Sequence, residues 1–553
     1  MHKTYLTLLL ALFTLQIQAQ QTVGLFLNDS LAYDGYTLLM PNSARSTYLL
    51  DNCGRVVNKW TSENIPYFST YLNPEGNLIR ATRFGATGGG VERYNWEGEL
   101  IWEYRFHGEG FSQHHDIELL PNGNILILAW ESFSQHQCIE AGRDPDLVDE
   151  ELRPEFIVEV EPLGTDSANI VWEWHAFDHL IQDHDPTKAN YGNPAEHPEL
   201  MDVNYIGLGG SYEDWLHANY IDYNPELDQI IMNSRNLNEF WIIDHSTTTE
   251  EAAGHTGGNS GKGGDILYRW GNPETYRRGT ADDRVFYRQH NAHWIPEGHP
   301  GAGQIMVFNN GLEREPIQFS SVDVLTPPVD AMGNYETPIA LPFAPTELYS
   351  SYTATPVESM YSARISSAQR LPNGHTLICV GQIGRLFEVD EDGAIYWDYI
   401  TPLQGSNPIE QGNPIMGNSV FKVARYAPDF EGFIGKDLTP GAPIELNPLP
   451  SDCEIVTDVE AATFTEFDLN AVPNPAFNEV YFSYNLNKKI NNAALELYNS
   501  QGQFLWKKHL PQDSREMKIN VGDLPSGVYF YRIISRENVS QAQKLILAKS
   551  SRN

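Results

Sequence analysis

Hydrophobic and polar residues recur along the chain in a unit of four short strands. In the clearest copy, residues 114–176, a strand leads into a Pro-Asn-Gly turn, two further strands follow, and a fourth contains Trp. Asn and Gly accept the positive φ that a tight hairpin needs, so each such turn joins two antiparallel strands. Four short strands repeated in this way predict the blades of a β-propeller. The other copies lie at 67–106, 217–271, 289–311 and 365–402.

The two ends of this repeat region are each incomplete. Residues 35–60 supply three strands without an innermost one, and residues 418–430 supply an innermost strand without the other three. Joining them makes a sixth blade and closes the ring, which removes exposed edge strands. Two insertions interrupt the units: residues 178–210 are rich in His, Asp and Pro, and residues 247–264 are rich in Gly.

The pattern changes after residue 450. The C-terminal residues alternate apolar and polar positions between Gly and Asn turns, which predicts a small antiparallel β-sandwich. We therefore expect an all-β protein, a six-bladed β-propeller followed by a small C-terminal β-sandwich. The expected parts are the propeller at 21–450, a linker at 451–467 and the sandwich at 468–553.

The first 20 residues have the features of a signal peptide. Lys3 gives a positive start, residues 5–13 are apolar, and Ala19 is a small residue before a cleavage point near Gln20. The apolar run is too short to span a bilayer, and no later run reaches the roughly 18 apolar residues of a membrane helix. We expect an exported protein with no transmembrane segment, either secreted or at the outer-membrane cell surface after transit through the periplasm.

Charge and cysteine content narrow the partners further. The chain has 36 Lys and Arg against 73 Asp and Glu, a formal charge of −37, which repels a nucleic-acid backbone. No Cys-x-x-Cys pair is present, so a thiolate zinc site is not expected. An oxidising compartment permits disulfides, but the sequence leaves all three pairings open. The four cysteines are Cys53, Cys138, Cys379 and Cys453.

Three histidines and a serine hold the same place in different units. Each lies six residues before the turn proline of its unit, or eight where the turn is longer; they are His115, His217, His290 and Ser366. This place starts the innermost strand, so three imidazoles are expected to converge at one mouth of the central channel. Converging histidines suit a metal site, a nucleophile with helpers that stabilise an anionic group, or simple hydrogen bonding between blades.

Two arginines and an amide lie close to these histidines in sequence. Arg235 is in a second strand, and Arg314 follows another second strand; a guanidinium there could hold sulfate or phosphate oxygens in a bidentate way. Asn309 and Asn310 could orient a neighbouring imidazole or form a turn. We predict Arg235 and Asn309 as substrate-binding residues.

Three segments resemble the bacterial arylsulfate sulfotransferases: DWLHANYIDYNPELDQIIMNSRN, GDILYRWGNP and QHNAHWIPEGHPGAGQIMVFNNG. The resemblance covers about residues 36–433. It implies a six-bladed propeller that transfers a sulfuryl group from an aryl sulfate to a phenolic acceptor through a sulfohistidine. It also implies no cofactor, no metal and no nucleotide sulfate donor.

The resemblance assigns roles residue by residue. His217 matches the family histidine after Asp-Trp-Leu, His290 matches that of the Gln-His segment, and Arg314 matches an arginine shortly after Asn-Gly. His375 lies in the region of the family histidine that becomes sulfated, although the repeat places it in a hairpin turn. With His115, these four residues form the predicted catalytic set, in which the nucleophile stays undecided.

The C-terminal segments PNPAFN, LPSGVYFYRI and QKLIL resemble the sorting domain of type IX secretion substrates. That resemblance implies the type IX machinery as a partner. Two other functions stay open: a non-catalytic secreted or cell-surface propeller that binds a partner, and a metal-dependent hydrolase that uses the histidines. The sequence does not decide the oligomeric state.

Overall fold

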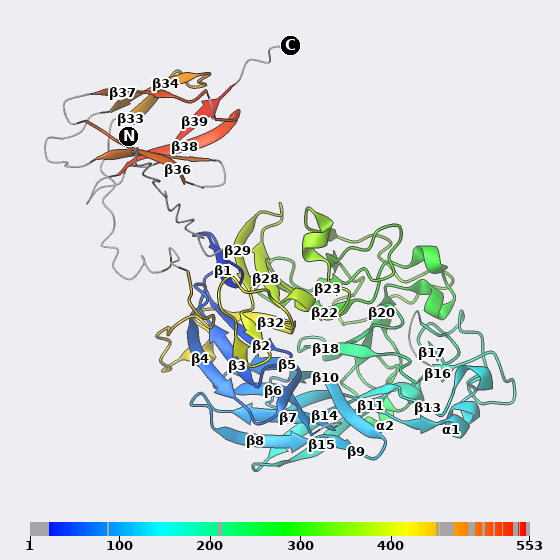
Figure 1. The fold of residues 1–553 in the computed structure, drawn as a ribbon. Helices are drawn as coiled ribbons and strands as arrows, with labels where there is room; N and C mark the ends of the chain where they lie inside the picture. The colour runs from blue at the N-terminus through cyan, green and yellow to red at the C-terminus, as the bar shows by residue number, and fades with distance from the viewer. Residues whose placement is uncertain are drawn as a thin grey trace, which may run out of the picture. The chain divides into compact units, whose positions relative to one another are not determined.

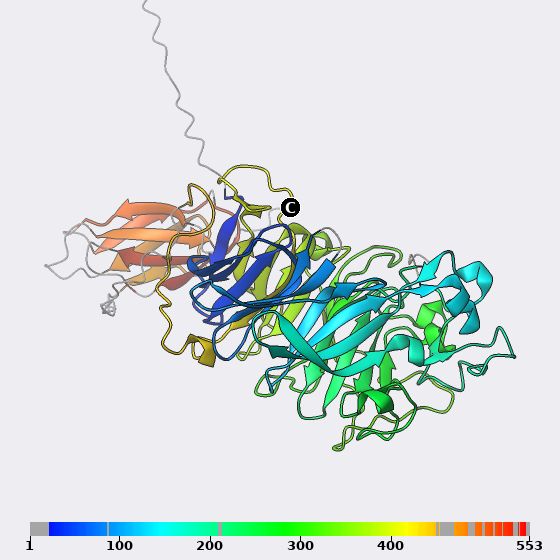
Figure 2. The same cartoon turned by 90° about the horizontal axis from the view of Figure 1, so that it is seen from below.

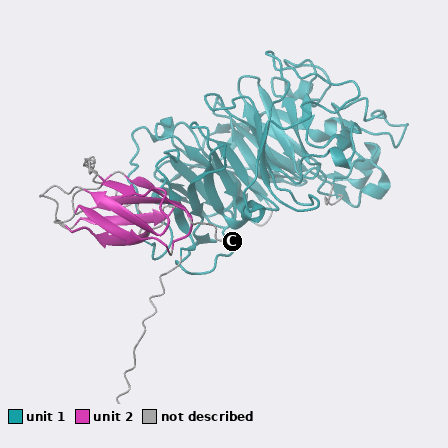
Figure 3. Ribbon diagram, turned by 90° about the horizontal axis from the view of Figure 1, so that it is seen from above, with its two compact units in different colours: residues 1–451 teal, residues 452–553 magenta. Residues whose placement is uncertain are grey.

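The computed structural model describes residues 21–85, 88–207, 213–449, 453, 469–484, 493–499, 504–511, 515–522, 524–534, 540 and 542–548. The expected signal peptide, and the expected linker apart from Cys453, lie outside the described residues. The chain divides into two compact units, residues 1–451 and 452–553, which are coloured separately in Figure 3.

The larger unit is built almost entirely of β-strands, and its described part contains six antiparallel sheets of four or five strands (Figures 1 and 2). The first sheet holds β32 (Val420–Tyr426), β2 (Tyr36–Pro41), β3 (Ser46–Leu50) and β4 (Val56–Thr61). The second holds β5 (Ile65–Leu72), β6 (Leu78–Phe84), β7 (Gly88–Tyr94) and β8 (Leu100–Arg105). The third holds β9 (His107–Gly108), β10 (Phe111–Leu119), β11 (Ile125–Glu131), β14 (Glu155–Leu163) and β15 (Ser167–His175).

The other three sheets follow in chain order. The fourth holds β18 (Ala218–Asn224), β19 (Gln229–Ser234), β20 (Glu239–Asp244) and β21 (Tyr268–Trp270). The fifth holds β22 (His290–Trp294), β23 (Ile305–Asn309), β24 (Ser321–Leu325) and β25 (Ser350–Tyr352). The sixth holds β26 (Ser367–Arg370), β27 (Thr376–Val380), β28 (Arg385–Val389), β29 (Ile395–Ile400) and β1 (Gly24–Asn28).

Short elements fill the connections between these sheets. Two α-helices are present in the described residues, α1 (Gln135–Glu140) and α2 (Thr249–Ala252). Three two-stranded pairs are β12 (Phe133–Ser134) with β13 (Glu151–Leu152), β16 (Leu180–Ile181) with β17 (Met201–Asp202), and β30 (Leu403–Gln404) with β31 (Asn407–Pro408).

The innermost strands form a closed ring. In the order β5, β10, β18, β22, β26, β32 and back to β5, each contacts the next. Figure 1 labels β5, β10, β18, β22 and β32 in the middle of the unit. The closing sheet combines the two ends of the unit, because β32 pairs with β2 in a register that sets Leu38 opposite Ala424. These are the two incomplete segments that the sequence pattern joins.

A hydrophobic cluster lies between each pair of consecutive sheets, six in all among the described residues. The alternation of side chains along a strand explains how one strand serves two clusters. Ile230 and Met232 of β19 face the third sheet, whereas Ile231 between them faces the fifth, and all three are fully buried. Each sheet is therefore held on both faces by its neighbours.

The tryptophans of the fourth strands tie consecutive sheets together. Each indole N–H donates a hydrogen bond at or beside the connection between the third and fourth strands of the next sheet. This satisfies the polar end of a ring whose remainder is buried. The donors and acceptors are Trp60 and Asn95 O at 2.8 Å, Trp102 and Ser167 O at 2.9 Å, Trp172 and Thr247 Oγ1 at 3.0 Å, Trp270 and Pro345 O at 2.8 Å, and Trp397 and Asn52 O at 2.7 Å.

The smaller unit has two antiparallel sheets around one hydrophobic cluster. One sheet holds β33 (Leu469–Val472), β34 (Glu479–Tyr484) and β37 (Glu516–Asn520). The other holds β36 (Phe504–His509), β35 (Ala494–Asn499), β38 (Gly527–Ile534) and β39 (Gln543–Leu547). The strict alternation of buried and exposed residues along Glu479–Tyr484 identifies strands with one face toward the core.

Two further features bear on the sequence predictions. Cys53 and Cys453 are disulfide-bonded, whereas Cys138 and Cys379 are buried free thiols. Among the described residues, none of the helices has the length and apolar character needed to cross a bilayer.

Candidate active site

The innermost strands share a local distortion at the place that the sequence repeat singles out. The pairing register of β10 shifts between Gln113 and Ile117, and comparable shifts occur in β5, β18 and β22. A bulge of this kind turns a strand and re-aims one side chain. Positive φ values accompany it at Phe68 (90°), His115 (54°), His217 (46°), Asn291 (57°) and Ser366 (96°). Non-glycine residues adopt this region at a cost of about 1–3 kcal/mol, typically at functional sites.

His115, His217 and His290 meet at these distortions, and we call them the histidine cluster. The ring centroids of His115 and His217 are 5.1 Å apart. Phe421 of β32 lies 6.0 Å from the ring of His115 and 6.1 Å from that of His290. Phe68 of β5 lies 5.1 Å from His115. Four innermost strands and the residue preceding a fifth thus contribute to one group of rings.

His217 is held at one ring nitrogen by a carboxylate. Its Nδ1 is 2.6 Å from Asp214 Oδ2, and its side chain is 27% exposed. Within the described part of the chain, Nε2 of His217 has no hydrogen-bond partner. Although burial favours the neutral acid, the His217 hydrogen bond and the nearby positive charges hold the pKa of Asp214 below its usual value. A carboxylate at Nδ1 fixes the tautomer, which leaves the lone pair on Nε2.

His290 is engaged at both ring nitrogens. Its Nδ1 donates to Asn310 Oδ1 at 2.7 Å, and its Nε2 accepts from the Ile365 backbone N–H at 3.2 Å. Burial and the charge of Arg235 lower the pKa of His290 to about 3, so the ring is neutral at ordinary pH. Asn310 is itself fixed by donating to the carbonyls of Ser362 and Ile365.

His115 is paired with its sequence neighbour. The Nδ1 atoms of His114 and His115 are 2.7 Å apart, so one of them donates to the other. Burial, and then the charges of the surrounding histidines and Arg235, lower the pKa of His115 well below its usual value. Burial likewise lowers the pKa of His114 to about 3. His114, His115 and His290 are therefore neutral imidazoles at ordinary pH.

Arg235 brings positive charge to this group. It immediately follows β19, its backbone N–H donates to His217 O at 3.2 Å, and its charge acts on both His115 and His290. Its Nη1 donates to Asn236 Oδ1 at 3.0 Å, an acceptor shared with the buried Arg288 at 2.9 Å. Burial and the neighbouring Arg288 lower the pKa of Arg235 to about 10, which still leaves it charged at neutral pH.

Two other predicted residues have different surroundings. The guanidinium of Arg314 lies over the rings of Phe319 at 4.1 Å and Tyr287 at 5.2 Å. Within the described part of the chain it makes no contact with the histidine cluster. Asn309 is fully buried; its amide donates to Val285 O and Asp323 Oδ2, and its Oδ1 accepts from Tyr287 N–H. It is the next residue, Asn310, that contacts an imidazole.

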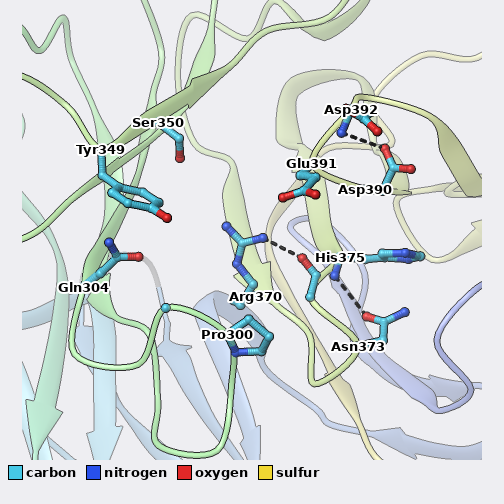
Figure 4. Close-up of a pocket in the computed structure, with 12 residues that line it drawn as sticks. Pro300, Gln304, Tyr349, Ser350, Arg370, Asn373, His375, Asp390, Glu391 and Asp392 are labelled. Carbon is cyan, nitrogen blue, oxygen red and sulfur yellow. Dashed lines mark hydrogen bonds between the residues drawn. The ribbon is translucent and has the colours of Figure 1, made fainter.

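His375 lies in the turn between β26 and β27, at the opposite end of β26 from Ser366. Its Nδ1 is 2.7 Å from Glu388 Oε1, and its ring stacks on Tyr396 at 4.7 Å. It borders a pocket with Arg370 and Asp390, and Figure 4 shows its ring directed away from Arg370. Ser366 accepts a hydrogen bond from Gly381 N–H at 2.9 Å beside the distortion of its strand.

Sequence reasoning missed four residues of this site. His114 and Asp214 each neighbour or closely precede a residue that was singled out. Phe68 carries the same signal as the histidines, because it lies six residues before Pro74, the turn proline of its unit. Phe421 carries no comparable signal, since its strand is separated from the rest of its sheet in the sequence.

A second polar group lies one step further along the same strands, and we call it the Lys422 cluster. Lys422 Nζ is 2.8 Å from Asp116 Oδ1 and lies 4.5 Å from the centre of the Tyr220 ring. It also contacts Tyr71, whose hydroxyl donates to Glu118 at 2.8 Å. Burial raises the pKa of Glu118 to about 8, and burial also raises that of Asp222. The members are Tyr71, Asp116, Glu118, Tyr220, Asp222 and Lys422.

Comparison with known families gives two matches. Residues 21–401, more than half of the chain, match the model of the arylsulfotransferase (ASST) family. Residues 470–548 match the secretion system C-terminal sorting domain, which indicates export by type IX secretion to the cell surface. No curated protein matches the chain.

Solved structures give only remote similarity. A protein of unknown function from Bacteroides caccae is 11% identical, with a TM-score of 0.40; the alignment covers 71% of this chain and 98% of that one. A streptogramin B lyase is 12% identical, with a TM-score of 0.33; the alignment covers 70% of this chain and 85% of that one.

Proposed function

The chain belongs to the arylsulfotransferase family, and on this premise we propose that it transfers a sulfuryl group from an aryl sulfate ester to a phenolic acceptor at the histidine cluster. The observation that carries the proposal is the convergence of His115, His217 and His290 next to the cationic Arg235; the first two have positive φ themselves, and the third precedes the positive-φ Asn291. Neutral imidazoles beside a fixed positive charge suit attack on an anionic ester.

His217 is the nucleophile in this proposal. Its Nδ1 proton is held by Asp214, so the lone pair on Nε2 is available, whereas both nitrogens of His290 are already engaged. Nε2 attacks the sulfur, the N–S bond forms, and the bond from sulfur to the aryl oxygen breaks with its electron pair leaving on the phenolate. The product is an N-sulfated His217 whose imidazolium charge is balanced by Asp214.

Arg235 and the aromatic rings supply binding. The sulfuryl oxygens carry the negative charge through the transition state, and the Arg235 guanidinium is a permanent cation whose charge acts on both His115 and His290. The rings of Phe68 and Phe421, 5.2 Å apart, offer an apolar surface for the aryl group. His290 donates no proton in this scheme; Asn310 fixes it as a neutral wall of the site.

The second half-reaction is the reverse of the first with a different phenol. The acceptor oxygen attacks the sulfur of sulfated His217, the N–S bond breaks, and the electron pair returns to Nε2. The proton lost by the acceptor ends on the first phenolate, so the overall exchange balances. His115, 5.1 Å from His217, relays this proton. Because its pKa is lowered, the ring of His115 stays neutral, and it takes up a proton at one nitrogen as it gives one up at the other.

We further propose an architecture for secretion. The six sheets and the closed ring of innermost strands support a six-bladed β-propeller over 21–450. The two sheets of the smaller unit support a β-sandwich over 468–553 that addresses the chain to the type IX machinery. Residues 1–20 act as a signal peptide, and residues 451–467 link the two parts.

The test is turnover of 4-nitrophenyl sulfate by the full chain, with and without added phenol. We expect nitrophenolate release to rise with phenol and phenyl sulfate to accumulate in equal amount. Without an acceptor, rapid quenching and peptide mass analysis should find one sulfuryl group on the peptide that contains His217. The control for His217→Ala is the same substitution at a surface histidine, His299→Ala, which should keep sulfuryl transfer.

Other outcomes decide against parts of the proposal. Nitrophenolate release that is equal without phenol, with free sulfate as product, identifies a sulfatase and overturns transfer. A sulfuryl group on another histidine keeps the reaction and overturns the assignment of His217. No release from any aryl sulfate favours a binding protein.

A further inference from the structure

Two long connections of the larger unit meet through three side chains that the proposed reaction does not use. His179 begins the first insertion, residues 178–210, directly after β15 and a single helical turn. His255 lies in the second insertion, residues 247–264, and Asp265 directly follows it. Both imidazoles point Nδ1 at the same carboxylate oxygen: Asp265 Oδ1 is 2.9 Å from His179 and 2.8 Å from His255.

The two ring nitrogens of His179 have different hydrogen-bond partners. Its Nε2 lies 2.9 Å from the carbonyl oxygen of Ala252, which can only accept, so Nε2 carries a hydrogen. Its Nδ1 then either carries a second proton, which makes a fully buried imidazolium, or presents a lone pair to a carboxylate oxygen. The side chain of His179 is 0% exposed. A lone pair and an anionic oxygen that face each other leave a place for a cation, either a proton shared by the pair or a metal ion.

The surroundings match those of a metal ligand. A ligating histidine commonly donates its other N–H to a backbone carbonyl, which sets the tautomer and the ring orientation. Ala252 O has that place here, at the end of α2, whose own N-terminus is fixed by a capping box from Thr248 and Glu251. Trp174 stacks on His179 with an interplanar angle of 6° and donates to Gly264 O at 2.7 Å.

Close packing holds the second insertion against His179. A Cβ on Gly264 would lie 2.0 Å from Ala252 O and 2.6 Å from His179 Nε2. Only glycine leaves room for the carbonyl and the imidazole to meet there. His255, in contrast, is 60% exposed, so one side of the site is open to water.

We propose that His179, His255 and Asp265 bind a divalent transition-metal ion, zinc in the first instance, which joins the two insertions. The candidate ligand atoms all lie within 4.8 Å of one another. Zinc with bonds of about 2.0–2.1 Å needs its ligands about 3.3 Å apart, so small side-chain shifts suffice. Two imidazoles and one carboxylate suit zinc rather than calcium or magnesium, and water completes the four ligands.

The experiment measures metal rather than activity. The full chain, expressed with zinc and dialysed against metal-free buffer without chelator, is analysed by plasma mass spectrometry. We expect about one zinc per chain in the wild type, and none in His255→Ala or Asp265→Asn. Because His255 is exposed, His255→Ala removes a ligand with little risk to folding. His197→Ala removes another exposed histidine, 2.9 Å from Glu199 in the first insertion, and should keep the zinc.

Thermal unfolding provides the second readout. Chelation should lower the Tm of the wild type by at least about 2 °C and leave that of His255→Ala unchanged. Equal zinc content in the wild type and in His255→Ala would overturn the proposal and leave an imidazolium–carboxylate pair as the link between the insertions. Sulfuryl transfer is unaffected by either result, because the two sites share no residue.

Discussion

The histidine cluster and the Lys422 cluster are built by the same innermost strands, yet their chemistry is opposite. His115 and Asp116 are adjacent in β10, and Phe421 and Lys422 are adjacent in β32. In each pair the first residue lies in or beside the histidine cluster, and the second belongs to the Lys422 cluster. In the Lys422 cluster the ammonium is matched by a carboxylate at 2.8 Å and by phenol groups, so its hydrogen-bonding capacity is used by protein. In the histidine cluster the rings of His115 and His290 are neutral, and Nε2 of His217 is left without a hydrogen-bond partner among the described residues. The difference separates groups that hold the ring together from groups that stay available to a substrate.

Substitution of His217 should produce the largest effect. His217→Ala removes the proposed nucleophile, and we expect sulfuryl transfer to fall at least about 1,000-fold. The free energy of unfolding should change little, because the side chain is partly exposed. The measurement is phenyl sulfate formation from 4-nitrophenyl sulfate, with urea unfolding in parallel. A loss below about tenfold would move the nucleophile to another histidine.

Substitution of Lys422 should reverse that pattern. Lys422→Ala leaves Asp116 buried without its cation, and breaking such a pair costs about 3–5 kcal/mol. We expect the urea midpoint to fall markedly, with an exposed lysine as control in Lys59→Ala. The double variant Lys422→Met with Asp116→Asn should recover much of the loss, because it removes the unpaired charge. An unchanged midpoint for Lys422→Ala would contradict the structural role of this cluster.

The buried histidines and the carboxyls of the Lys422 cluster should also change the free energy of unfolding in opposite directions as the pH changes. Burial lowers the pKa of His114 and His290 to about 3 and that of His293 to about 4. Below about pH 6.5 the unfolded chain therefore binds more protons than the folded one, and stability falls by about 1.4 kcal/mol per pH unit for each histidine.

The carboxyls of the Lys422 cluster act in the other sense. Because the pKa of Glu118 is raised to about 8, the folded chain keeps a proton that the unfolded chain has lost, and stability falls as pH rises from about 4.5 to 8. Between about pH 4.5 and 6.5 the two effects oppose each other, and above pH 6.5 the raised carboxyls act without the opposing histidines, so we expect stability to fall from about pH 6.5 to 8. Glu118→Gln should flatten the alkaline side of a plot of urea midpoint against pH, and His290→Gln the acid side. A slope unchanged by both variants would show that other groups control it.

The smallest expected effect concerns Asn310, a positioning residue. Asn310→Ala frees the ring of His290, and we expect kcat to fall about tenfold, with KM less affected. The neighbouring amide Asn309, which contacts no imidazole among the described residues, gives the comparison. Relative to Asn310→Ala, Asn309→Ala should lower the urea midpoint more and kcat less. Steady-state kinetics of both variants would distinguish a positioning residue from one that only stabilises the fold. An equal loss of kcat in the two variants would contradict the positioning role of Asn310.

The sequence predicts the site's location better than its contents. Offsets from the turn prolines identify His115, His217 and His290 because the repeat forces equivalent residues to one end of the innermost strands. Asp214 and Phe421 escape this reasoning, since their places depend on loop geometry and on pairing between β2 and β32. Arg314 matches a family position by spacing, yet its aromatic contacts follow from local packing that spacing does not encode. The all-β architecture follows more directly, because hydrophobic alternation and turn glycines act locally.

The joining of β32 to β2 has a consequence for how the molecule is made. Residues 36–61 emerge early in synthesis, but their sheet lacks its innermost strand until residue 426 is available. Until then β2 presents an unpaired edge, and the two neighbouring hydrophobic clusters stay incomplete. Contacts this distant along the chain form slowly, so the last step of assembly is the one that closes the ring. The edge of β2 thus stays unpaired until β32 is available. Any factor that covers this edge affects the yield of folded enzyme rather than the reaction that it catalyses.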